Sequence, residues 1–101
     1  MRLRGSSEVT ASIADLNGNV LAARVAVDLK KNNQGSFYLG PADSFNFEMD
    51  RPHIYRLTLE DGRYGDIETM GFHLLDNSGT NFVSFRLIGG LNYPPVLSFA
   101  Q

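Results

Sequence analysis

The sequence predicts an all-β fold, a single antiparallel β-sandwich or barrel-like domain of about eight or nine short strands, rich in hairpins. Three turns are the first evidence, at residues 15–18, 59–62 and 76–79; each ends in glycine and lies between runs that alternate apolar and polar residues. Such turns join antiparallel strands into hairpins. The second observation is that helical periodicity never persists for three turns, whereas a period of two recurs along the chain.

The first hairpin covers the turn at residues 15–18 and its flanking runs. A two-residue loop at Asn17-Gly18 would place Arg24 in the core beside Ala11, and an unpaired buried charge is costly. A three-residue loop over residues 16–18 pairs only apolar residues: Ile13 with Leu21, Ala11 with Ala23, and Val9 with Val25. A slip of one residue would invert every face, so we predict the three-residue loop, with Arg24 outside.

The other two turns are analysed in the same way. At residues 59–62, a three-residue loop pairs Leu57 with Gly65 and Tyr55 with Ile67, which favours it over a two-residue loop. In the third hairpin, a four-residue loop over residues 77–80 pairs three sets of apolar residues: Leu74 with Val83, Phe72 with Phe85, and Met70 with Leu87. Ile67 and Met70 are three positions apart, so a regular strand would place them on opposite faces. To bury both, we also predict a β-bulge near Thr69 or Gly71.

Three further strands are expected. Residues 36–39 form the first, which Gly40-Pro41 ends. Residues 44–49 form the second, with Phe45, Phe47 and Met49 buried. Residues 96–99 follow Pro94-Pro95, which suggests an extended approach at the edge of a sheet.

Length and composition predict one domain over residues 8–101, preceded by a flexible N-terminal segment over residues 1–7. The chain has 101 residues, 43% of them hydrophobic, which is ordinary for a folded protein. The net charge is −2 and the pI about 5.5, whereas nucleic-acid binders usually carry a basic excess, so we expect no nucleic-acid partner. No run approaches the roughly 20 apolar residues of a membrane span, so we expect no membrane insertion.

The absence of cysteine excludes disulfides, zinc–thiolate sites and thiol catalysis. It fits a reducing compartment, and we expect a cytoplasmic location if this is the full-length chain. The two histidines, His53 and His73, lie far apart in the sequence. We therefore expect no metal and no cofactor.

Catalytic patterns are equally sparse. Asp66 and Glu68 share one face of a predicted strand, as paired catalytic carboxylates would, but the hairpin register places them on the solvent side. No serine lies in a Gly-x-Ser-x-Gly motif, and no helix follows Gly89-Gly90 to bind an anion. The expectation is a protein that is not an enzyme and has no catalytic residue.

The remaining candidates are tyrosines and arginines near strand ends. Tyrosine and arginine are enriched at binding hot spots. The possible interaction surface consists of Tyr38, Arg51, Arg63, Tyr64 and Tyr93. We expect a non-catalytic binding or accessory module that contacts a protein partner or self-associates through an edge strand. The alternative is a β domain that binds a small ligand or carbohydrate.

Overall fold

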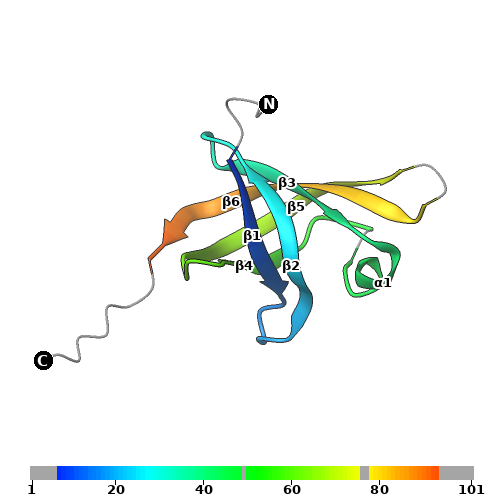
Figure 1. The fold of residues 1–101 in the computed structure, drawn as a ribbon, viewed down its shortest axis with the longest axis horizontal. Helices are drawn as coiled ribbons and strands as arrows, with labels where there is room; N and C mark the ends of the chain where they lie inside the picture. Colours follow the sequence, from blue (N-terminus) through cyan, green and yellow to red (C-terminus); the bar gives the residue numbers. More distant parts are fainter. Residues whose placement is uncertain (1–6, 49, 76–77, 94–101) are drawn as a thin grey trace, which may run out of the picture.

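Six antiparallel strands close into a barrel in the computed structural model, which describes residues 7–48, 50–75 and 78–93 (Figure 1). Neighbouring strands follow the order β1-β2-β3-β6-β5-β4, and β4 pairs with β1. The elements in chain order are β1 (Ser7–Ala14), β2 (Val20–Leu29), β3 (Gln34–Leu39), the short helix α1 (Pro41–Ser44), β4 (Ile54–Leu59), β5 (Tyr64–Leu75) and β6 (Thr80–Asn92). The all-β prediction is confirmed, as a barrel with six strands instead of eight or nine.

The predicted strand over residues 44–49 is wrong. Pro41 opens α1, because its fixed φ suits the first position of a helix. The Ser44 hydroxyl donates to the Gly40 carbonyl at 2.8 Å and accepts from Asn81 Nδ2 at 3.0 Å, which ties α1 to β6. Phe47 is buried as expected, but Phe45 is 87% exposed.

Some expectations fall outside the described residues. Met49, the predicted strand at residues 96–99 and the first six residues of the expected N-terminal segment all lie there. Ser7, the last residue of that segment, begins β1.

The first turn is confirmed, but its register holds only near the loop. The Gly18 N–H donates to the Asp15 carbonyl at 3.1 Å, and Gly18 has a φ of 94°, as expected of the glycine that closes such a loop. Ala14 pairs with Val20 in the predicted register. Farther along, the observed pairs differ: Ile13 with Ala22, Ala11 with Val25, and Val9 with Val27.

Two register shifts explain this difference: one lies between Ile13 and Ala14, and the other is a β-bulge at Arg24. Arg24 has a φ of 58°, and the register of β1 against β2 shifts between Ala11 and Ile13. The bulge leaves Ala23 and Arg24 exposed while Ala22 and Val25 both point into the core. The predicted exposure of Arg24 is therefore confirmed, and the predicted burial of Ala23 is wrong.

The second hairpin forms as predicted. Leu57 pairs with Gly65 and Tyr55 with Ile67. The Gly62 N–H donates to the Leu59 carbonyl at 2.9 Å, which closes the three-residue loop. The register holds because it buries Tyr55, Leu57 and Ile67 together.

The third hairpin is displaced by two residues from the predicted register. Leu75 pairs with Thr80, so Thr80 belongs to β6 and not to the predicted loop, while residues 76 and 77 lie outside the described residues. Phe72 consequently pairs with Val83 and not with Phe85. The predicted bulge is present between Thr69 and Gly71, and it leaves Met70 at the surface.

Apolar side chains from all six strands fill the barrel. The largest fully buried ones are Phe37, Phe85, Ile13, Leu39, Leu57, Ile67, Val27 and Val83. Phe37 and Phe85 lie with their ring centroids 5.7 Å apart near the centre. With the interior occupied by side chains, any binding site among the described residues must lie on the outside of the barrel.

Candidate functional site

The β5–β6 hairpin extends beyond β4, the strand that pairs with β5 in the barrel. The pairing ends at His53, whose carbonyl accepts from the Thr69 N–H at 2.9 Å. The preceding residue is Pro52, which has no N–H to donate. At the same level, the bulge at Met70 bends β5 away. Figure 1 shows the ends of β5 and β6 projecting at the right of the view, in yellow.

This geometry leaves one side of β5 open over residues 70–75, which we call the β5 edge. No described strand pairs with that side, while the other side pairs with β6 up to Leu75. The edge reads Met-Gly-Phe-His-Leu-Leu and contains no Lys, Arg, Asp, Glu or Pro. Met70 is 46% exposed and Leu74 66%. Natural sheets usually block such edges with charges or proline, and this edge has neither.

An aromatic row crosses the outer face of the same hairpin. Tyr38 of β3 lies directly opposite Phe82 of β6, which lies opposite His73 of β5. The rings of Tyr38 and Phe82 are 5.2 Å apart between centroids. Tyr38, one of the predicted interaction residues, therefore lies level with the β5 edge but two strands away from it, because β6 lies between β3 and β5.

Arg51, a second predicted interaction residue, lies at the base of the edge. It lines a hollow of about 140 Å³ between the loop at residues 50–52 and β5 at residues 69–72. A larger hollow, of about 480 Å³, lies between the turn after α1 and the start of β6 and includes Phe45 and Gly79. The surface around the hairpin is thus uneven, and it includes the charged residues Glu48, Asp50 and Arg51.

The other three predicted residues lie elsewhere. Tyr64 begins β5 and pairs with Asn92 at the far end of β6, next to Tyr93. Phe82 and Asn92 are ten residues apart on β6, which corresponds to roughly 30 Å along a strand. The structure therefore separates Arg63, Tyr64 and Tyr93 from Tyr38 and from Arg51, and it places Tyr38 and Arg51 on opposite sides of the β5–β6 hairpin.

Local contacts already occupy much of the group formed by Arg63, Tyr64 and Tyr93. The Arg63 Nε donates to Asp61 at 2.9 Å. The guanidinium of Arg56 lies 5.2 Å from the centre of the Tyr64 ring and also donates to Asp66 at 2.7 Å. Tyr93, 75% exposed, is the most accessible of the three.

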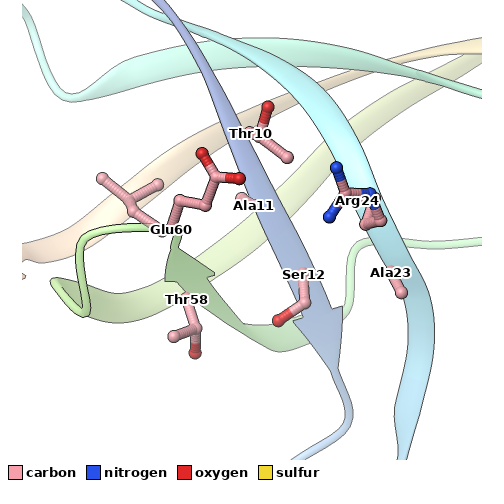
Figure 2. A pocket seen from close by; sticks show the side chains of 8 residues that line it. Thr10, Ala11, Ser12, Ala23, Arg24, Thr58 and Glu60 are labelled. Atoms are coloured by element: carbon pink, nitrogen blue, oxygen red, sulfur yellow. The ribbon is translucent and has the colours of Figure 1, made fainter.

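A second feature is a groove across the outer face of β1, with a volume of about 190 Å³. Figure 2 shows Arg24 on one side of β1 and Glu60 on the other, with Thr10 and Ser12 between them. Thr58, which is polar, and Ala23, which is apolar, also line the groove. Sequence reasoning missed this groove, because β1 and β4 lie side by side only after the barrel closes.

The carboxylates considered for catalysis are held in ion pairs on the surface. Asp66 accepts from Arg56, and Glu68 accepts from Arg86 at 2.8 Å. No group of three or more His, Asp or Glu side chains converges on a metal-sized site within residues 7–48, 50–75 and 78–93. The part of the chain that the structure covers also has no helix that is long and apolar enough to cross a membrane.

The shifted pKa values have structural causes. The side-chain amide of Asn19, which donates to Asp15 at 2.9 Å, lowers the pKa of Asp15 most. The backbone N–H of Arg63 is the largest cause of the lowered pKa of Asp61. Burial raises the pKa of Tyr55, whose hydroxyl accepts from the Glu48 N–H at 2.8 Å. Each of these groups has an evident role in a turn or in packing.

Comparison with known protein families, with curated proteins and with solved structures finds no match to this chain. The case for function therefore depends on the β5 edge and on the groove over β1.

Proposed function

We propose that this chain is a non-catalytic protein-interaction module that forms a homodimer by pairing the β5 edge of one copy with that of a second. The observation that carries the proposal is the open, uncharged edge at residues 70–75. An added strand would satisfy its free backbone groups and cover the exposed part of Leu74.

Self-complementarity favours a second copy as the occupant. An edge without charge offers nothing to select an oppositely charged partner, whereas two identical edges can pair around a two-fold axis. The loop at residues 50–52 lines a hollow with residues 69–72 of β5, and the open side of β5 at residues 73–75 lies beyond this loop.

A two-fold axis at His73 pairs residues 71–75 of the two copies, with residues 71 and 72 beside the loop at residues 50–52. It places Gly71 opposite the partner's Leu75, and Phe72 opposite the partner's Leu74. In this register, even-numbered residues pair with even-numbered ones and odd-numbered with odd-numbered ones, so paired side chains lie on the same face of the extended sheet. Phe72 and Leu74, which share a face, would then form an apolar cluster across the interface.

The first test is the oligomeric state of the wild-type chain and of Leu74→Lys, measured by size-exclusion chromatography with light scattering from micromolar to millimolar concentration. We expect the wild type to dimerise with increasing concentration. Leu74→Lys should remain monomeric, because a lysine on a strand edge opposes pairing.

The matched control is Leu16→Lys, which places the same charge at an equally exposed leucine, 62% against 66%, in the first turn. It should dimerise like the wild type. A wild-type chain that stays monomeric throughout, or a dimer that Leu74→Lys leaves intact, would contradict the proposal.

A further inference from the structure

We infer that the groove over β1 is a separate binding site for a small zwitterion with an amino group and a carboxylate, such as a free amino acid or a dipeptide. This inference goes beyond the proposed dimer, because the groove is formed by β1, β2 and the end of β4 and includes no residue of the β5 edge.

The charges at the two sides of the groove carry the inference. Three arginines of the described chain have carboxylate partners: Arg56, Arg63 and Arg86. Arg24 and Arg51 have no partner among the described residues, and neither does the carboxylate of Glu60. Although Arg24 and Glu60 line the same groove, they do not pair with each other. One unpaired cation and one unpaired anion thus face the same small volume.

The strands determine how far apart these charges lie. β1 pairs with β2 on one side and with β4 on the other, and Ala11 lies opposite both Val25 and Leu59. Arg24 and Glu60 directly flank these partners, so their backbones are separated by about two strand spacings, roughly 10 Å. Both side chains are long enough to reach the ends of a compact ligand lying across β1.

The bulge in β2 is what brings Arg24 to this position. Without it, alternation would turn one of Ala23 and Arg24 toward the core. With Arg24 at a φ of 58°, both residues face outward beside the groove. Bulges and strained residues are concentrated at binding sites, where they redirect side chains.

The rest of the lining suits a small polar ligand. Thr10, Ser12 and Thr58 supply hydroxyl groups that can donate or accept, and Ala23 leaves space beside Arg24. The volume of about 190 Å³ is below the roughly 300–1,000 Å³ of pockets for drug-sized ligands. The expected geometry has the ligand carboxylate on the Arg24 guanidinium and its ammonium on the Glu60 carboxylate.

The test is an NMR titration of the ¹⁵N-labelled full chain with diglycine, N-acetyl-diglycine and diglycine amide. Diglycine should shift the amide signals of Thr10, Ser12, Arg24 and Glu60. Removal of either ligand charge should weaken binding about tenfold, which corresponds to about 1.4 kcal/mol, because it removes one charge-assisted contact.

Arg24→Gln and Glu60→Gln assign each charge to its partner. Arg24→Gln should bind diglycine and diglycine amide equally weakly, and Glu60→Gln should no longer distinguish diglycine from its N-acetyl form. Lys31→Gln and Glu48→Gln, which change exposed charges away from the groove, should bind as the wild type does. The inference fails if no shifts occur at the groove at millimolar diglycine. It also fails if blocking the ligand charges has the same effect on the wild type and on the two groove variants.

Discussion

Arg24 adopts a left-handed backbone conformation, with a φ of 58°, that arginine seldom takes. The cost for an L-residue other than glycine is about 1–2 kcal/mol. Packing in the barrel offsets this conformational free energy, because Ala22 and Val25, on either side of the bulge, are both buried. A single strained residue thus keeps two core positions filled and presents a cation to the groove over β1.

Replacement of Arg24 by glycine and by alanine separates the strain from the loss of the side chain. Arg24→Gly should be more stable than Arg24→Ala by about 1 kcal/mol, because only glycine adopts this φ without a steric penalty. Urea unfolding of both variants measures the difference. Equal stability of the two variants would show that the backbone at residue 24 carries no strain.

Asp15 makes the stability of the first hairpin depend on pH. Its carboxylate accepts from the backbone N–H groups of Asn17 and Asn19 and from the Asn19 side chain, each at 2.9 Å. These bonds lower the pKa of Asp15 in the folded chain, the Asn19 side chain contributing most. The stabilisation is therefore complete above the unfolded-state pKa, about 3.9, and is lost as the pH falls through the folded-state value.

Thermal unfolding of Asp15→Ala against the wild type tests this dependence. We expect a lower Tm for the variant at pH 7, and a difference that disappears once the carboxyl group of the wild type is protonated. A Tm difference that persists unchanged into strong acid would assign the effect to packing.

At the scale of elements, β3 lies against the core with no space for a side chain at Gly35. A Cβ at this position would lie 2.5 Å from the Phe85 ring and 2.6 Å from the Asp28 carbonyl oxygen. Phe85 is fully buried, so its ring cannot move out of the way. Gly35 therefore sets how closely β3 approaches β2 and β6.

Gly35→Ala should destabilise the barrel by about 1–3 kcal/mol, the usual range for an overpacked core. Gly40→Ala is the control, because a Cβ there meets no atom within 4 Å and its φ of −69° suits alanine. Chemical denaturation of both variants measures the contrast. A Gly35→Ala variant as stable as Gly40→Ala would contradict the tight packing of β3.

The sequence predicted those elements in which local pattern and tertiary packing agree. The hairpin at Leu57 and Ile67 formed in its predicted register because turn chemistry and apolar alternation favour the same pairs. The predicted strand over residues 44–49 was wrong, because the same alternation of phenylalanines also fits a turn in which Phe47 points inward and Phe45 outward. No sequence pattern predicted the bulge at Arg24, since arginine has no preference for a positive φ.

The candidate sites were only partly predictable for the same reason. The neutral run at residues 70–75 is visible in the sequence, but its open side depends on where β4 stops pairing, at His53. The groove over β1 requires contact between Ala11 and Leu59, which lie 48 residues apart in the chain. Such contacts follow from closure of the barrel and leave no local pattern.

In the molecule as a whole, closure of the barrel removes most strand edges; among the described residues, one side remains unpaired in β2 before Val27, in β6 beyond Leu87 and along the β5 edge. The interior is filled with side chains, so binding is confined to the outer surface. The β5 edge and the groove over β1 are formed by different parts of that surface. We propose that the β5 edge joins two copies of the chain around His73.

Cysteine crosslinking tests this pairing, since the chain has no cysteine of its own. A single His73→Cys substitution would place two thiols opposite each other across the two-fold axis, at Cα separations of roughly 4.5–5.5 Å that permit a disulfide. Under mild oxidation we predict rapid formation of a covalent dimer by His73→Cys and little by Leu16→Cys, which lies in the exposed first turn. A His73→Cys chain that stays monomeric, or that crosslinks no faster than Leu16→Cys, would contradict the account.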